Sequence, residues 1–498
     1  MVRSLVSELL LHDIGSYRVE FIYATAKEPY RFAHRYIERL RCNLPTATAD
    51  EIANPEEGDI YLGLDCQIEI VLTHTQFFDQ IKKNGGKVYF VVYDLLSIFF
   101  EDYFAPNQLS IHTSWLNSIT QMDGAVCISQ SVASELEAWL GENQPIRQQP
   151  FGIGWFRPGT DIDASQRSIG LPANAAAAIG AIGTRQSFLL VGKAEPRKGQ
   201  LQALAAFQLL WDKGIDVNLV LVGRHGWLVD SLLDNLNDTS ERGKRLFWLN
   251  GVSDQFLEKV YATSTCLLAI SEGEGFCLPL IEAAHHKLPI IARDIPVFRE
   301  VAGKHAYYFS GVEPSKLANA LVDWLALFNT GRHPKSGDMP PLTWAQSTAR
   351  LLDVVLNNKW SVHWESDGTF RCVGADSRLK TLVGKRFGSS IKTTGVEGVL
   401  LYGPYIKLPE GEYQVKVHGQ ILRFGVSHAR IAITAHFGTT LLCTHEVNVT
   451  GRDGLIANMQ VRIAAPVSEF EVNFWVPSDC DMSISLLEVF LVTRAAAD

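Results

Sequence analysis

Residues 271–282 (Ser-Glu-Gly-Glu-Gly-Phe-Cys-Leu-Pro-Leu-Ile-Glu) combine groups that could bind a phosphorylated sugar. Glu274 and Glu282 have seven residues between them, and Gly275 follows the first of them. Backbone N–H groups that are free at a glycine-containing turn before a helix favour an anion. Carboxylates beside such a turn can accept hydrogen bonds from sugar hydroxyls. The simpler alternative is that Glu282 only complements the helix dipole and that Glu274 is a solvated loop residue.

Two adjacent cations, Arg197 and Lys198, follow another apolar run at residues 187–192. A guanidinium and an ammonium placed at the end of a strand could neutralise a diphosphate and stabilise it as a leaving group. A solvated surface pair is the alternative. We favour the binding role, because the position after a strand and the charge agree.

Both groups must be held by a sheet whose strands end near them. The apolar run 266–270 predicts a buried strand, and residues 281–286 predict a helix with Pro279 in its first turn. Such alternation recurs along the chain and predicts parallel sheets covered on both faces. The chain opens on a helix, so the first strand is missing or replaced. Other expected strands are 17–23, 59–64, 87–93, 124–129, 187–192, 217–223, 247–252 and 289–292, and other expected helices are 2–11, 30–41, 131–140, 201–213 and 254–263.

The length, charge and cysteine content of the chain limit the classes of protein to which it can belong. A chain of 498 residues should hold more than one domain, and a net charge of −9 argues against nucleic acid as the main partner. The eight cysteines show no CxxC pair and no metal-ligand spacing, which predicts buried free thiols in a reducing compartment. Without an apolar membrane span or a signal peptide in the sequence, we expect a soluble, cytoplasmic protein.

The motifs together resemble a known family. Residues 187–358 resemble the nucleotide-binding half of a retaining glycosyltransferase of the GT-B fold, family GT4. The fold implied is α/β, with two Rossmann-like domains facing a cleft. The pieces that carry the resemblance are 191–199, 221–227, 250–254, 271–282 and 292–303.

The resemblance implies roles for individual residues on the donor side. Arg197 and Lys198 would hold the donor diphosphate, and Glu274 would bind the sugar hydroxyls; these three form the predicted catalytic set. Glu282 would bind the ribose. The family usually has glycine at the position of Cys277. The remaining donor-binding residues implied are Gly192, Gly223, Arg224, Gly251, Val252, Gly275, Phe276, Cys277 and Leu278, with Gly251 and Val252 facing the base.

Residues 1–155 resemble the acceptor half of the same family. Tyr93 and Asp94 correspond to a strand-end motif that often reads His-Asp-Leu, with tyrosine in place of the histidine. Ser129 resembles a serine turn that faces the cleft. Packing within the strand is an equally good explanation for Tyr93.

The remaining segments complete the expected organisation. We expect a linker at 156–186, a nucleotide-sugar-binding domain at 187–342 and a helix crossing back to the first domain at 343–358. Short alternating strands predict an all-β jelly-roll sandwich at 360–498, which resembles carbohydrate-binding modules. Tyr405 or Trp475 could stack on sugar rings, although core packing is the alternative that we favour.

These observations predict a retaining hexosyltransferase that builds a bacterial surface polysaccharide such as O-antigen or capsule. It would transfer mannose or rhamnose, with a GDP-sugar favoured over a UDP-sugar, to a lipid-linked or polymeric glycan. No obligatory cofactor or metal ion is expected. The basic segment 30–41 is compatible with weak association at the inner membrane, although a solvated face is favoured. Other polysaccharide assembly enzymes are conceivable partners.

Three alternatives stay open. The chain could be a catalytically silent glycan-binding or scaffold subunit of an assembly complex. It could be another GT-B enzyme, such as an epimerase or a phosphorylase. The missing first strand also fits a segment of a larger multidomain enzyme.

Overall fold

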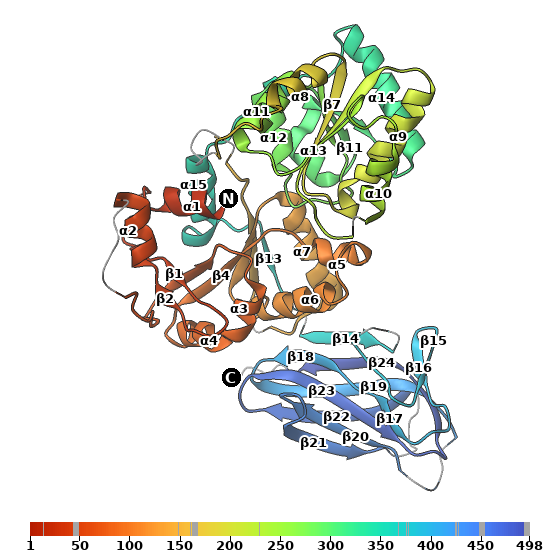
Figure 1. The fold of residues 1–498 in the computed structure, drawn as a ribbon. Coiled ribbons are helices and arrows are strands. Elements are labelled where there is room, and N and C mark those ends of the chain that lie inside the picture. Colours follow the sequence, from red (N-terminus) through yellow and green to blue (C-terminus); the bar gives the residue numbers. More distant parts are fainter. Residues whose placement is uncertain are drawn as a thin grey trace.

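A computed structural model gives the fold as two α/β units and one all-β unit (Figure 1). None of the helices in the described part of the chain has the length and apolar character needed to cross a lipid bilayer. The residues described are 1–12, 14–42, 49–147, 149–159, 161, 168–228, 230–366, 368–374, 376, 378–423, 426, 428–447 and 454–492.

The first unit is built on a five-stranded sheet with the order β13-β6-β5-β4-β3. Strands β3 to β6 are parallel, and β13 joins the edge antiparallel to β6. Both faces of the parallel strands are covered, which is why β4 and β5 are almost continuously apolar and buried. The elements are α1 (Val2–Leu9), α2 (His34–Cys42), β3 (Ile60–Gly63), α3 (Ile68–Thr73), α4 (Thr75–Lys83), β4 (Lys87–Val92), α5 (Leu96–Phe99), η1 (Glu101–Tyr103), α6 (Gln108–Ile119), β5 (Gly124–Cys127), α7 (Gln130–Asn143), β6 (Phe151–Trp155) and β13 (Val362–Trp364).

The second unit is a six-stranded, fully parallel sheet with the order β12-β11-β10-β7-β8-β9. Separate apolar clusters pack on its two faces. The elements are α8 (Ala175–Ile182), β7 (Gln186–Val191), η3 (Pro196–Lys198), α9 (Gln200–Asp212), β8 (Val217–Val222), α10 (Asp230–Asp238), β9 (Leu246–Leu249), α11 (Asp254–Thr263), β10 (Cys266–Ala269), α12 (Leu278–His285), β11 (Ile290–Arg293), α13 (Pro296–Ala302), η4 (Gly303–His305), β12 (Tyr307–Phe309), α14 (Pro314–Asn329) and η5 (Ser336–Asp338).

Helix α15 (Trp344–Leu356) returns the chain from the second unit to the first. It begins at a capping box formed by Thr343 and Gln346, so the helix start is specified locally. It packs against α1 and against β5 and β6 of the first sheet (Figure 1). Two parallel α/β sheets linked by a returning helix are the architecture that the predicted GT-B fold class requires.

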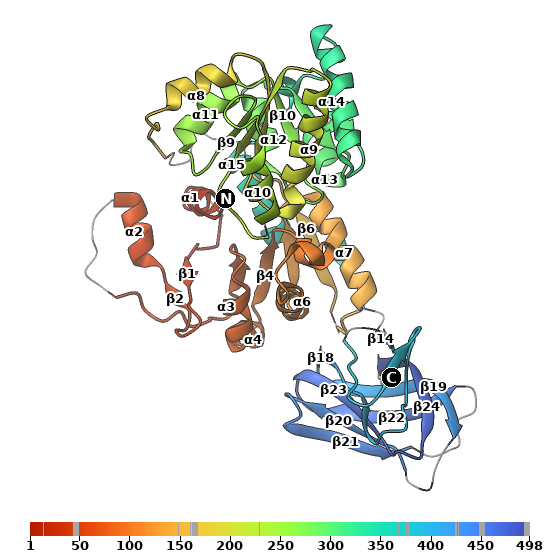
Figure 2. The same ribbon diagram turned by 45° about the vertical axis from the view of Figure 1, so that its right-hand side comes forward.

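The third unit contains two antiparallel sheets that enclose an apolar core. Figures 1 and 2 both place it beside the first unit and away from the second. Ile146 from the first unit is buried in its core, and Lys407 donates to the Ser118 hydroxyl at 3.1 Å. Its strands are β14 (Thr369–Val373), β15 (Lys385–Phe387), β16 (Ser390–Lys392), β17 (Gly398–Leu401), β18 (Pro404–Leu408), β19 (Gly411–Arg423), β20 (Arg430–Ala435), β21 (Thr440–Glu446), β22 (Leu455–Ile463), β23 (Val467–Val476) and β24 (Asp481–Leu491).

The N-terminal expectations need correction. The strand expected at 17–23 is only β1 (Ile22–Tyr23), which pairs antiparallel with β2 (Arg31–Phe32) and stays outside the parallel sheet. The basic helix expected at 30–41 begins at His34 instead, because Arg31 and Phe32 belong to that hairpin. An alternation of strands and helices predicts a parallel sheet, but this segment instead forms a local antiparallel hairpin of β1 and β2.

Two later segments also differ from the expectation. Helix α8 lies within the expected linker and packs against α11. Residues 362–364, which were expected in the sandwich, pair with β6 of the first sheet. Residues 160 and 162–167 of the expected linker and 493–498 of the expected sandwich lie outside the described residues.

Cysteines whose side chains are described are free thiols, but the predicted burial holds only in part, because Cys66 is exposed and Cys277 and Cys443 are partly buried. Four of these seven are buried, and none of the described His, Cys, Asp and Glu side chains form a cluster suited to a metal ion.

Candidate functional site

The loops that follow β7, β8 and β10 meet at the carboxyl edge of the second sheet, where ligands bind in open α/β folds. Gly192 and Gly223 let the first two of these loops run in contact. A Cβ atom on Gly223 would lie 1.9 Å from the carbonyl oxygen of Gly192. Farther along, the backbone N–H of Ala194 donates to the Arg224 carbonyl at 2.9 Å. Both glycines therefore set the spacing of the loops, while their predicted contact with a donor stays a prediction.

The predicted catalytic residues converge on one charge cluster. Arg197 contacts the Glu274 carboxylate at 3.2 Å and the Glu195 carboxylate at 3.1 Å, and Lys198 pairs with the other oxygen of Glu274. Arg197 also donates to the Gly273 carbonyl at 2.8 Å. The side chains of Arg197, Lys198 and Glu274 are 12%, 17% and 9% exposed, so the cluster is held in place and shielded from solvent.

Two cations and two carboxylates make this cluster neutral in charge. Burial by itself raises the pKa of Glu274, but Lys198 and Arg197 outweigh it and hold that pKa below the ordinary value. Glu274 is therefore an ionised acceptor at neutral pH. Arg and Lys retain further N–H donors beyond those used here, so an incoming anion could share both cations.

The segment after the cluster begins helix α12. Cys277 precedes α12 with φ 76° and ψ 75°, in the left-handed region that favours glycine. Cys277 therefore adopts a conformation that glycine would adopt without strain. Phe276 is buried, Leu278 is 39% exposed and begins the helix, and Pro279 occupies its first turn.

Glu282 lies one turn into α12 and is bound by Tyr261 of α11. The Tyr261 hydroxyl donates to Glu282 Oε2 at 2.6 Å. Burial raises the pKa of Glu282, and the hydrogen bond from Tyr261 partly offsets this. The carboxylate is therefore positioned by a neighbour that the sequence alone did not single out.

The remaining residues predicted to bind a donor lie on the outer loops of the same edge. Arg224 and Gly251 are exposed, and Gly251 follows β9 with φ 63°. Val252 packs against the apolar cluster that also contains Phe256. Among the described residues, none of these three forms a hydrogen bond or ion pair with the charge cluster, so their predicted contacts with a base or phosphate stay predictions.

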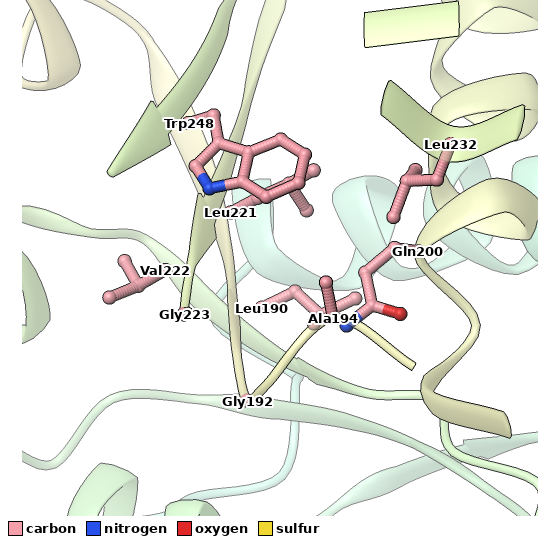
Figure 3. A pocket seen from close by; sticks show the side chains of 9 residues that line it. All are labelled: Leu190, Gly192, Ala194, Gln200, Leu221, Val222, Gly223, Leu232 and Trp248. Carbon is pink, nitrogen blue, oxygen red and sulfur yellow. The ribbon is translucent and has the colours of Figure 1, made fainter. Parts of the chain in front are cut away.

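A hollow lies at this edge on the side covered by α9 and α10 (Figure 3). Gly192 and Gly223 line it, whereas Arg197, Lys198 and Glu274 do not. A neighbouring hollow shares Trp248 with it and is lined also by His225, Asn237, Arg242 and Asn250. The complete lining of the first is Leu190, Gly192, Ala194, Gln200, Leu221, Val222, Gly223, Leu232 and Trp248.

On the first unit, two of the three predicted acceptor-side residues reach the loop after β10. Ser129 Oγ donates to the Gly275 carbonyl at 2.7 Å. A Cβ atom on Gly275 would lie 2.1 Å from the Tyr93 carbonyl oxygen, so only glycine allows this approach. The Tyr93 hydroxyl donates to the Leu64 carbonyl at 2.6 Å, and the Asp94 carboxylate accepts from the backbone N–H of Leu96 at 3.1 Å. The side chains of Tyr93 and Asp94 therefore form hydrogen bonds within the first unit.

Several residues that bring the site together were missed by the sequence reasoning. The Tyr103 hydroxyl of the first unit donates to Glu272 at 2.9 Å, and Trp227 donates to the Tyr103 carbonyl at 2.7 Å. Buried Arg293 donates to the carbonyls of Ile270 and Ser271 from beneath the loop. Arg293 lies inside the quoted stretch 292–303, so a cation directly after a buried strand was the available signal.

Comparison with known proteins defines the class of the second unit. Residues 174–332 match the family model described as Glycosyl transferases group 1. This part of the chain is therefore similar to group 1 glycosyl transferases. The match covers β7 to β12 and the charge cluster, which is the segment that resembled the family from its motifs.

Particular proteins are similar over longer or shorter parts. The chain is 41% identical over 354 residues to the serotype-specific mannosyltransferase WbdA of Escherichia coli, a match that covers 70% of this chain and 43% of that protein. It is 34% identical over 119 residues to O-antigen chain mannosyltransferase B of Escherichia coli, covering 23% of this chain and 30% of that protein. The chain thus spans less than half of the length of WbdA.

A solved structure is also similar to part of the chain. Sucrose-phosphate synthase from Thermosynechococcus elongatus matches with a TM-score of 0.44 and 16% identity, covering 59% of this chain and 69% of that one.

Proposed function

We propose that the chain is a retaining mannosyltransferase that transfers mannose from a nucleotide diphosphate sugar, GDP-mannose first, to a growing O-antigen glycan. The observation that carries the proposal is the convergence of Arg197, Lys198 and Glu274 at the carboxyl edge of a domain similar to group 1 glycosyl transferases. The choice of mannose is supported by the similarity over 70% of the chain to a protein described as a mannosyltransferase. GDP as the nucleotide and the retaining outcome are part of the proposal.

In the proposed reaction, the bond between the anomeric carbon and the diphosphate oxygen breaks, and a bond from that carbon to the acceptor oxygen forms on the same face. The acceptor hydroxyl proton passes to the departing diphosphate. Arg197 and Lys198 stabilise the negative charge that develops there, which is where fixed cations contribute most. Both are largely buried, so little reorganisation is needed when the charge appears.

Glu274 is proposed to bind the sugar of the donor. Its carboxylate is kept ionised by the two cations and could accept hydrogen bonds from sugar hydroxyls. Glu282, held by Tyr261, would accept hydrogen bonds from the ribose hydroxyls of the donor. The first unit would bind the acceptor glycan near Ser129 and Tyr93. These two residues contact Gly275 in the loop after β10 directly.

The test uses the full chain with an O-antigen acceptor and a panel of GDP-, UDP- and dTDP-sugars. Product formed only with GDP-mannose, with the anomeric configuration retained by NMR, is the expected result. The variant Arg197→Ala/Lys198→Ala should lose both nucleotide binding and transfer, whereas Lys213→Ala at the exposed end of α9 should change neither. Nucleotide binding without transfer from any sugar would instead support the silent-subunit alternative.

A further inference from the structure

Glu300 of the second unit lies at the N-terminus of a helix of the first unit. It is on α13, which follows β11, and α13 packs against α7. The Glu300 side chain is 7% exposed although it is charged. A buried carboxylate needs hydrogen-bond donors, and the ones that it uses belong to the other unit.

The contacts are specific. Glu300 Oε1 accepts from the backbone N–H of Gln130 at 2.9 Å, and Oε2 accepts from the backbone N–H of Ser131 at 2.8 Å and from its hydroxyl at 2.8 Å. The first N–H groups of a helix have no partner within the helix and carry partial positive charge. Glu300 therefore supplies acceptors to the N–H groups of Gln130 and Ser131, in addition to Ser129, the capping residue of α7 itself.

The residue before this contact is Ser129. Its hydroxyl accepts from the backbone N–H of Val132 at 3.1 Å and donates to the Gly275 carbonyl at 2.7 Å. The start of α7 thus contacts α13 through Gln130 and Ser131, and it contacts the loop after β10 through Ser129. These contacts lie next to one another in the chain, so a shift of α7 relative to α13 would also move Ser129 away from Gly275.

A third partner joins the contact to the segment that connects the two units. Arg157 follows β6, and its Nη2 donates to the Glu300 carbonyl at 3.0 Å while its Nε lies 3.5 Å from Glu300 Oε1. The guanidinium thus places a cation beside the Glu300 side chain, so the segment after β6 is part of the same contact.

We propose that Glu300 is a positioning residue for sugar transfer: it latches α7 to α13 and so sets the distance between the acceptor side and the loop that carries Glu274 and Gly275. The proposal rests on the proposed transferase function for its kinetic consequence. Its structural consequence, the relative placement of the two α/β units, is independent of that function. In the described part of the chain Glu300 forms no hydrogen bond or ion pair with Arg197, Lys198 or Glu274, so the affinity for nucleotide should not depend on it.

The experiment compares Glu300→Gln and Glu300→Asp with the wild-type full chain. Glutamine keeps the size but removes the charge and points an N–H₂ group at the helix N–H groups, whereas aspartate keeps the charge on a shorter arm. Glu137→Gln is the matched control, because Glu137 is exposed on the same helix α7. Ser131→Ala removes one of the donors and serves as a milder second variant.

Three readouts separate the explanations. For Glu300→Gln we expect at least a tenfold lower kcat, an unchanged Kd for GDP by calorimetry and a larger radius of gyration by small-angle scattering. Glu300→Asp should recover part of the kcat, Ser131→Ala should lie between wild type and Glu300→Gln, and Glu137→Gln should match wild type. Unchanged kcat and scattering in Glu300→Gln would overturn the proposal, as would a fall in thermal stability that aspartate does not relieve. If no sugar is transferred by the wild type, the proposed function fails, while the scattering of Glu300→Gln still decides the latch.

Discussion

The Tyr261 hydroxyl donates to the Glu282 carboxylate across 2.6 Å, joining helices α11 and α12 at the carboxyl edge of the second sheet. Both groups are largely removed from water. Burial raises the pKa of each, and the nearby carboxylate raises that of Tyr261 further. The pair thus holds one proton on the phenol and leaves the carboxylate as the acceptor.

Tyr261→Phe removes the hydrogen bond that lowers the pKa of Glu282. The pKa of Glu282 should then rise further, and a protonated carboxyl is a poorer acceptor for ribose hydroxyls. We expect GDP affinity to fall about tenfold, which is about 1.4 kcal/mol, and to fall further as the pH is lowered, sooner than in wild type. Calorimetry over a pH series measures this. Tyr307→Phe on the edge strand β12 is the control, and equal affinities for Tyr261→Phe and wild type at every pH would contradict the assignment of Glu282.

Glu274→Gln should separate binding from transfer. In the free protein Glu274 occupies both Arg197 and Lys198, so its removal leaves two cations less neutralised. We expect GDP to bind more tightly by about fivefold, on the order of 1 kcal/mol. Transfer should nevertheless fall by about a hundredfold, because the proposed reaction places the ionised Glu274 carboxylate at the reacting sugar and this variant removes its charge. Kd from calorimetry and kcat from product formation test the two halves. The surface variant Asp323→Asn should alter neither, and weaker GDP binding in Glu274→Gln would argue against competition for the cations.

Cys277 should tolerate glycine and reject valine. Its left-handed backbone costs a non-glycine residue about 1 kcal/mol, and a β-branched side chain makes that conformation still less accessible. We expect Cys277→Gly to stay within about 1 kcal/mol of wild type, since lost packing and relieved strain oppose each other. Cys277→Val should be destabilised by about 2 kcal/mol or more and lose transfer. Urea unfolding decides this, and equal stability of the two variants would show that the turn is not the constraint.

Glu135 gives a pH dependence that does not involve the charge cluster. Burial, with a smaller contribution from Asp94, raises the pKa of Glu135 from 4.5 to about 7, and its Oε2 has no hydrogen-bond partner in the described part of the chain. Because the folded state binds this proton more tightly than the unfolded state, stability is lost as the pH rises from about 4.5 to about 7.

Glu135→Gln should therefore be more stable than wild type at pH 8, by about 2 kcal/mol after allowance for solvent screening. The difference should disappear near pH 4.5, below which both states bind the proton. Urea unfolding at both pH values measures it. Glu137→Gln, exposed on the same helix, should show little difference at either pH, and a gain that is equal at both values would point to packing rather than protonation.

The sequence predicted what local patterns encode. Helix α15 (Trp344–Leu356) lies within the expected 343–358, because Thr343 and Gln346 form a capping box at its start. Helix α11 matches the expected 254–263, because Ser253 caps its start. Arg197, Lys198 and Glu274 could be placed at one sheet edge because parallel strands end together. The ion pairs that these three side chains form with one another depend on their burial in the folded protein. No pattern in the sequence predicts those ion pairs.

Contacts between units could not be predicted in the same way. Gln130 and Glu300 are separated by 170 residues, and no periodicity relates them. The strand expected at 17–23 was wrong for a related reason: an apolar alternation predicts a strand but does not specify which partner it pairs with.

The pairing of β13 with β6 determines at which residue the chain can be truncated without removing a strand from the first sheet. Trp364 lies opposite Phe151, and the ring of Trp360 fills the space above Gly152, where a Cβ atom would come within 2.7 Å of it. A protease or a truncation that acts just after α15 would strip this edge strand and leave the backbone of β6 open to strand pairing with other chains. A cut after Trp364 would instead leave the first sheet whole, so we expect only the later boundary to release the two α/β units without an open sheet edge at β6.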